Sequence, residues 1–131
     1  MIAVDTSVWV AALRARDSVP AVVLTALLDS DEVALPVPVR LELLAGASRT
    51  DRPHLRRALS ALPVVYPTDA TWFTMDAWIE RAAASGERFG LGDLLIGALA
   101  AEVGALVWSL DTDFARMERV RLVSLYDPAA G

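Results

Sequence analysis

The sequence predicts an α/β protein with a parallel sheet covered by helices on both faces. Short, continuously apolar segments such as Ile2-Ala3-Val4 alternate along the chain with longer helical patterns. Strands that are apolar throughout belong to sheets buried on both sides, and alternation with helices favours parallel strands. Asp5 and Asp111 follow two of these segments, at the sheet edge where α/β proteins bind ligands.

In the first half of the chain, most element boundaries have a recognisable signal. In order, the expected elements are a strand Ile2–Val4, helices over 8–13 and 21–28, a strand Val33–Leu35, a helix over 39–47 and a helix opened by Pro53. Asp5-Thr6-Ser7 stops the first strand with residue types that favour helix N-caps. Pro36 closes the second strand, and Pro53 suits the first turn of a helix. Gly46, or the residues just after it, ends the helix over 39–47.

The second half continues the alternation. The expected elements are a strand Val64–Tyr66, a helix over 70–84, a helix over 94–103, a strand Leu106–Trp108, a turn over 109–113 and a last strand Leu122–Leu125. Pro67 ends the third strand, and Gly86 and Gly104 stop the two helices. The helix over 94–103 is apolar nearly all round, which predicts a buried helix. Because no repeat or long linker divides the chain, residues 1–131 are expected to form one domain.

Composition excludes several classes of function. No apolar run approaches the roughly 18–20 residues of a membrane span, and the N-terminal segment lacks the basic region of a signal peptide, so we expect a cytoplasmic protein with no membrane contact. Without cysteine or lysine, the chain cannot use thiolate zinc sites, Schiff bases or a P-loop lysine. The net charge of −5 means that a nucleic-acid substrate must be approached through bound cations or a local arginine patch.

Four carboxylates are candidates for a metal site. They are Asp5, Glu42, Asp93 and Asp111, each located where an apolar segment meets a turn or a helix. Each also has a purely structural interpretation, as a helix cap, a turn residue or the partner of an arginine. A site made only of carboxylates suits Mg²⁺ or Mn²⁺, and such sites commonly process phosphate esters. Two like charges about 4 Å apart repel by ~4 kcal/mol at an effective dielectric near 20, so four converging carboxylates favour a bound cation.

The segments around these carboxylates resemble the PIN-domain ribonucleases, and within them the VapC-type toxins of toxin–antitoxin pairs. The matching segments are Val4–Trp9 (VDTSVW), Pro38–Gly46 (PVRLELLAG), Gly92–Ala100 (GDLLIGALA) and Leu106–Phe114 (LVWSLDTDF). The resemblance implies a three-layer α/β/α sandwich with a five-stranded parallel sheet. It also implies that Asp5, Glu42, Asp93 and Asp111 are the catalytic residues and hold Mg²⁺, with Mn²⁺ as a substitute.

Other residues take expected roles from the same resemblance. Thr6 and Ser109 would supply hydroxyls behind the metal ligands, and Asp113 would either be a further ligand or only orient its loop. The chain also has one dense positive patch, whose arginines include Arg49, Arg52 and Arg56. This patch is either a solvated surface or a contact for RNA phosphates.

The resemblance implies hydrolysis of RNA phosphodiester bonds, in tRNA or rRNA, by metal-activated water. It also implies three partners: an RNA substrate, a VapB-type antitoxin with a basic side chain aimed at the pocket, and a second copy in a homodimer or higher assembly. An inactive PIN-like binding module is the alternative, although such a module would be expected to lack one or more of the acids. A receiver-like phosphoacceptor domain would need a lysine that the chain lacks. DNA as the substrate is disfavoured by the VapC-like length and motifs.

Overall fold

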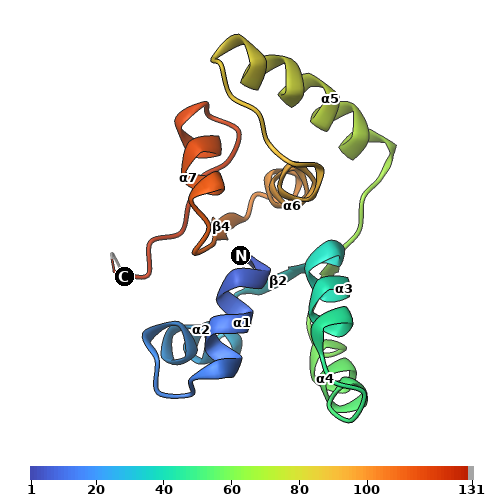
Figure 1. The fold of residues 1–131 in the computed structure, drawn as a ribbon, viewed down its shortest axis with the longest axis vertical. Coiled ribbons are helices and arrows are strands. Elements are labelled where there is room, and N and C mark those ends of the chain that lie inside the picture. The colour runs from blue at the N-terminus through green and yellow to red at the C-terminus, as the bar shows by residue number, and fades with distance from the viewer. Residues whose placement is uncertain (130–131) are drawn as a thin grey trace.

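A parallel sheet forms the middle layer of the computed structural model, which describes residues 1–129 (Figure 1). The strands of the sheet are β1 (Ile2–Val4), β2 (Val33–Pro36), β3 (Val64–Val65) and β4 (Leu106–Trp108). Their order across the sheet is β3-β2-β1-β4, and each neighbouring pair is parallel. The predicted α/β fold with a parallel sheet is therefore confirmed.

The predicted fifth strand is not part of this sheet. Leu122–Leu125 contributes a single parallel bridge, in which Leu125 pairs with Val107 of β4. The Tyr126 N–H donates to the Val107 carbonyl over 2.8 Å, so the segment follows the outer edge of β4 for about one residue pair. The first two side chains of the segment are buried in the core. The apolar pattern thus reflects burial of side chains, and four strands replace the expected five.

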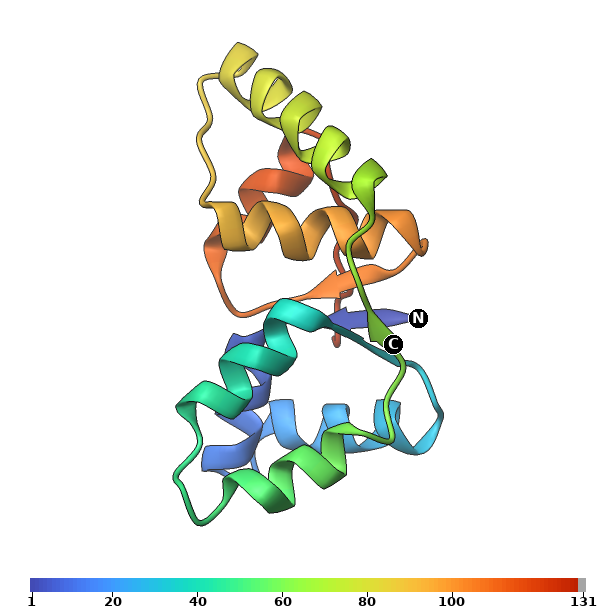
Figure 2. The same ribbon diagram turned by 90° about the vertical axis from the view of Figure 1, so that its right-hand side faces the viewer.

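Helices cover both faces of the sheet (Figure 2). They are α1 (Thr6–Arg14), α2 (Val19–Asp29), α3 (Val37–Gly46), α4 (Arg52–Leu59), α5 (Asp69–Ala84), α6 (Leu91–Glu102) and α7 (Thr112–Arg119). Figure 2 shows α1 to α4 below the sheet and α5 to α7 above it, which gives the expected three layers. Within residues 1–129, no helix is long and apolar enough to cross a membrane.

The α6 helix is buried, as its apolar sequence predicts, but it begins earlier than expected. It starts at Leu91, whose side chain is 68% exposed, so the apolar pattern becomes visible only one turn later. Asp93 consequently lies inside the first turn and not before the helix. Farther along, a Cβ added at Gly97 would lie 2.8 Å from Met117 Cε, which shows how closely α7 approaches α6 at this point.

The α7 helix was not predicted, because its first residues were interpreted as the end of a turn. The Asp113 N–H donates to Asp111 Oδ1 over 3.0 Å, so Asp111 caps the N-terminus of α7. Phe114 and Met117, three residues apart, are its two buried side chains. Two large apolar side chains in eight residues are too few to give a clear helical period.

Candidate metal centre at the carboxyl ends of β1 and β4

The strand order reverses between β1 and β4. The chain lays β2 and β3 on one side of β1 and then returns to place β4 on the other side. In open α/β sheets, ligands bind at the carboxyl ends of strands where the order reverses in this way. The Asp5 N–H donates to the Trp108 carbonyl over 2.8 Å, which fixes the ends of the two strands side by side.

Asp5 is held at this reversal point by two serine hydroxyls. Ser7 Oγ and Ser109 Oγ each donate to Asp5 Oδ2 over 2.8 Å, one from α1 and the other from the residue after β4. Asp5 is 7% exposed and occupies the N-cap position of α1, yet its side chain makes no capping hydrogen bond. Among the described residues, nothing donates a hydrogen bond to its second oxygen, Oδ1. That oxygen is available to a ligand.

Ser7, which the resemblance did not name, supplies a hydroxyl to Asp5, whereas the Thr6 hydroxyl acts on Glu42 and lowers its pKa. Thr6 Oγ1 is buried and has no hydrogen-bond partner of normal geometry in the described part of the chain. Ser109, which the resemblance named, does contact Asp5 and also accepts a hydrogen bond from the Asp111 N–H over 2.9 Å. Ser7 could have been suggested by its place in the polar triplet after β1, which was interpreted only as a helix-capping signal.

Three carboxylates from two helix N-termini converge beside Asp5. One oxygen from each of Asp93, Asp111 and Asp113 can be chosen so that all lie within 4.8 Å of one another. Asp93 comes from the first turn of α6, and the other two come from the cap and first turn of α7. The three residues, called the acidic cluster below, could hold a metal ion, because an all-oxygen set of carboxylates suits hard divalent cations.

The electrostatics of Asp93 connect Asp5 with the acidic cluster. The pKa of Asp93 is raised to about 7, chiefly by burial and then by a hydrogen bond with Asp113. The negative charges of Asp111, Asp113 and Asp5 raise this pKa further. A carboxyl group that stays protonated near neutral pH marks a site with more negative charge than its surroundings neutralise. A divalent cation would relieve that repulsion.

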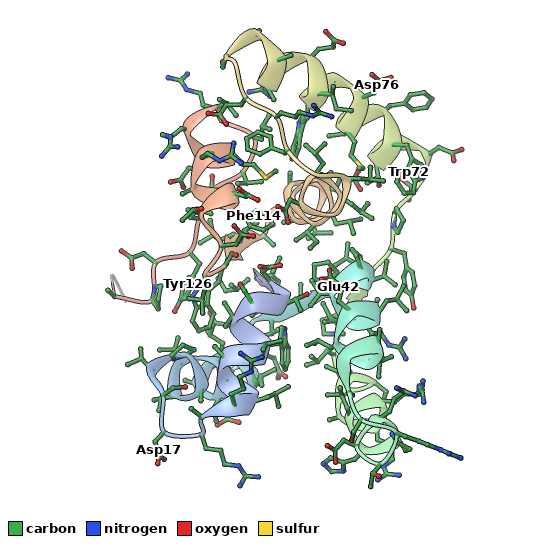
Figure 3. The ribbon with its side chains drawn as sticks, in the orientation of Figure 1. Asp17, Glu42, Trp72, Asp76, Phe114 and Tyr126 are labelled. Carbon is green, nitrogen blue, oxygen red and sulfur yellow. The ribbon has the colours of Figure 1, made fainter. Side chains whose placement is uncertain are left out.

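Glu42 reaches the same region from α3 but is not a member of the acidic cluster. Partial burial raises its pKa, the charge of Asp5 raises it further, and the Thr6 hydroxyl lowers it in part. Figure 3 shows Glu42 on the side of α3 that faces the middle of the molecule. No arginine pairs with Glu42 within residues 1–129, so the salt-bridge interpretation of this residue does not apply. Asp5 therefore interacts electrostatically with both Glu42 and Asp93.

One cation contacts the acidic cluster, and the sequence pattern did not suggest it. Arg116 Nη2 lies 2.6 Å from Asp113 Oδ1, and Arg116 Nη1 pairs with Glu87 in the loop between α5 and α6. The guanidinium carbon also lies 4.8 Å from the centre of the Phe89 ring. The pKa of Asp113 is lowered, mainly by its hydrogen bond from Arg116. The spacing of Asp113 and Arg116 on one helix was the available signal.

The predicted arginine patch lies along the loop before α4 and on α4 itself. Arg49 and Arg56 are exposed. Arg52 has a structural contact, since its Nε donates to the Leu44 carbonyl over 2.9 Å and its Nη2 donates to the Ala47 carbonyl over 3.0 Å. These bonds satisfy carbonyl groups at the end of α3. A role in RNA contact stays a prediction for all three arginines.

Comparison with known proteins identifies relatives along most of the chain. The family model described as "PIN domain" matches residues 2–120. Ribonuclease VapC11 from Mycobacterium tuberculosis strain H37Rv is 38% identical over 126 residues, which cover 92% of this chain and 93% of that relative. The VapC ribonuclease Mb1587 from Mycobacterium bovis is similar to the same extent, at 38% identity.

Solved structures share the fold. A chain in the crystal structure of VapBC2 from Rickettsia felis, bound to a DNA fragment from its promoter, superimposes with a TM-score of 0.78 at 20% identity, covering 96% of this chain and 98% of that one. A chain in the structure of VapBC-5 from Mycobacterium tuberculosis superimposes with a TM-score of 0.67 at 25% identity, covering 94% of each. This chain therefore belongs to the PIN-domain family, in which its curated relatives are VapC ribonucleases.

Proposed function

We propose that this protein is a Mg²⁺-dependent endoribonuclease, with Mn²⁺ as a substitute, and the toxin of a toxin–antitoxin pair. The observation that carries the proposal is the set of mutually repelling carboxylates at the ends of β1 and β4, in a chain whose relatives are VapC ribonucleases. A module that only binds a protein partner gains nothing from such repulsion. A nuclease uses it to hold a divalent cation.

In this proposal the metal is held by Asp5, Glu42, Asp93 and Asp111, with Asp113 as a further ligand. Ser7 and Ser109 orient Asp5 by binding its Oδ2, which leaves Oδ1 for the ion. When bound, the ion lowers the pKa of a coordinated water and stabilises negative charge on the leaving oxygen.

The proposed substrate is RNA, in the form of tRNA or rRNA. The bound cation and the arginine patch at Arg49, Arg52 and Arg56 would offset the repulsion between RNA phosphates and a chain of net charge −5. Because metal-activated water needs no 2′-hydroxyl as nucleophile, the products should have 5′-phosphate and 3′-hydroxyl ends. Cyclic phosphate ends would contradict the proposed mechanism.

Cleavage of purified tRNA and rRNA by the wild type, Asp93→Asn and Asp111→Asn tests the proposed site. Asparagine keeps the size of the side chain but removes a charged ligand, so both variants should lose on the order of 100-fold or more in kcat. Asp76→Asn is the matched control, because Asp76 is exposed on α5 (Figure 3) and should leave cleavage unchanged. Wild-type cleavage by Asp93→Asn and Asp111→Asn would remove the acidic cluster from the mechanism.

The proposed partner is a VapB-type antitoxin, and a homodimer or a higher toxin–antitoxin assembly is the proposed oligomeric form. Expression of this chain alone should arrest growth, and co-expression of the antitoxin should relieve the arrest. A basic side chain of the antitoxin that occupies the metal position would make inhibition weaker at high Mg²⁺. If the protein neither binds Mn²⁺ nor cleaves RNA but still binds the antitoxin, the inactive PIN-like module is the better account.

A further inference from the structure

Arg116 connects the loop over 85–90 with the start of α7, two segments that are separate in sequence. Its guanidinium pairs with Glu87 in the loop over 85–90, with Asp113 at the start of α7, and lies over the ring of Phe89. A carboxylate oxygen of Asp113 in turn lies within 4.8 Å of one of Asp93 of α6. A continuous path of polar contacts therefore runs from the loop over 85–90 to the acidic cluster.

We propose that Arg116 is a positioning residue for the metal site, which fixes both Asp113 and the loop over 85–90 for turnover. The inference rests on the proposed function and adds a residue that acts through Asp113 and does not bind the metal itself. Two carboxylates on different elements accept from the two terminal nitrogens of one guanidinium. Only the planar fork of an arginine supplies donors in this arrangement, and the flat face that remains stacks on Phe89.

The contacts are more than an ordinary surface ion pair. Exposed salt bridges contribute little, since solvent screens them and both side chains must be ordered. Here the side chains of Arg116, Glu87 and Asp113 are 31%, 26% and 37% exposed, so all three are partly covered. Because Asp113 is a member of the acidic cluster, its orientation determines where one oxygen of the cluster lies.

The loop held by Arg116 also borders a groove between α5 and the start of α6. Glu87 and Phe89 line a groove of about 380 Å³ together with residues of α5 and α6, among them Ile79 and Leu91. The rest of the lining is mainly apolar. Movement of the loop would therefore change the shape of this groove. Arg116 sets this shape and the position of Asp113 together.

A positioning role predicts two effects of opposite sign when Arg116 is replaced by glutamine. Loss of a positive charge next to the acidic cluster should leave Mn²⁺ affinity unchanged or increase it by up to about tenfold. Loss of the fixed Asp113 and loop should decrease kcat by about 10- to 100-fold, the usual effect of removing a residue that orients metal ligands. A variant that is merely less well folded would lose metal affinity and turnover together.

The experiment compares Arg116→Gln and Arg116→Lys with Arg119→Gln. Arg119 is exposed one turn later on α7, so Arg119→Gln removes the same charge from the same helix. Titration calorimetry measures the Mn²⁺ affinity of each variant. Cleavage of one RNA substrate gives kcat and KM, and hydrogen exchange over residues 85–91 reports how well ordered the loop is. Arg116→Lys keeps the charge without the fork, so we expect unchanged Mn²⁺ affinity, reduced kcat and faster exchange in the loop.

The outcomes separate this inference from the proposed function. Reduced kcat with retained or tighter Mn²⁺ binding in Arg116→Gln, and wild-type behaviour in Arg119→Gln, would support the role of Arg116. A wild-type kcat in Arg116→Gln, or weaker Mn²⁺ binding, would overturn that role and leave the proposed function standing if Asp93→Asn is inactive. If the wild type itself cleaves no RNA, the proposed function is wrong.

Discussion

Replacing Asp93 by asparagine should stabilise the metal-free protein at alkaline pH, although the change removes a proposed metal ligand. Burial and the neighbouring carboxylates raise the pKa of Asp93 from 3.8 to about 7 in the folded protein. Between these pH values the folded protein keeps a proton that the unfolded chain has lost. The free energy of unfolding therefore decreases as the pH rises through this window, and the loss is complete above the folded pKa. Asparagine has no charge and avoids this loss.

The magnitude follows from the pKa and from the exposure of the side chain. A rise from 3.8 to about 7 corresponds to about 4 kcal/mol between the charged and neutral forms. Because Asp93 is only partly buried, solvent screening reduces the effect to about 1–2 kcal/mol. Asparagine also loses the favourable interaction of a carboxylate with the N-terminus of α6, which costs about 0.3–1 kcal/mol. The net gain expected for Asp93→Asn above neutral pH is about 1 kcal/mol.

Urea unfolding in EDTA, followed by tryptophan fluorescence from about pH 5.5 to about pH 8.5, measures this difference. The gain of Asp93→Asn over the wild type should increase with pH and level off above the folded pKa. Asp69→Asn is the matched control, because Asp69 is an exposed carboxylate in the first turn of α5, away from the acidic cluster. That variant should lose about 0.3–1 kcal/mol, the opposite sign.

Added Mn²⁺ should make the wild type more stable than Asp93→Asn, the reverse of the order expected in EDTA. At a 100-fold excess of Mn²⁺ over its dissociation constant, linkage stabilises the wild type by about 2.7 kcal/mol, and Asp93→Asn should gain less. If Asp93→Asn is no more stable than the wild type in EDTA at about pH 8.5, carboxylate repulsion does not strain this site. The electrostatic argument for the metal would then be refuted.

Packing, the support of Asp5 and metal binding can each be tested by one further change. Gly97→Ala should destabilise the protein by about 1 kcal/mol or more in thermal melts, because the new Cβ would lie 2.8 Å from Met117 Cε. Gly92→Ala is the control: its Cβ would meet open space, so this variant should be as stable as the wild type or more stable. Ser109→Ala removes a donor to Asp5 and should cost about 1 kcal/mol in urea unfolding and weaken Mn²⁺ binding in calorimetry, whereas Ser109→Thr should retain both. The melting temperature of the wild type should be lower in EDTA than in Mg²⁺ or Mn²⁺, and equal midpoints would contradict the metal site.

Elements whose signals are local were predictable from the sequence. Four short apolar strands were located to within about a residue, because continuous apolar runs end at caps and prolines. Their parallel arrangement then placed Asp5 and Asp111 at one edge of the sheet. The strand predicted at Leu122–Leu125 was wrong, because a buried loop and a buried strand can have the same apolar sequence. Only hydrogen-bonded pairing with a neighbouring strand distinguishes the two.

The orientation of side chains around the site was decided by tertiary structure. Whether Ser7 or Thr6 reaches Asp5 depends on how α1 is turned against β4, which brings Ser109 within reach of the same carboxylate oxygen. The pairing of Arg116 with Glu87 depends on where the loop over 85–90 passes α7. Caps and apolar periods are determined by residues a few positions apart, so the sequence by itself identified the strands and the acids that end them. Contacts between elements depend on packing of the whole chain, and only the folded structure determined which groups hold those acids in place.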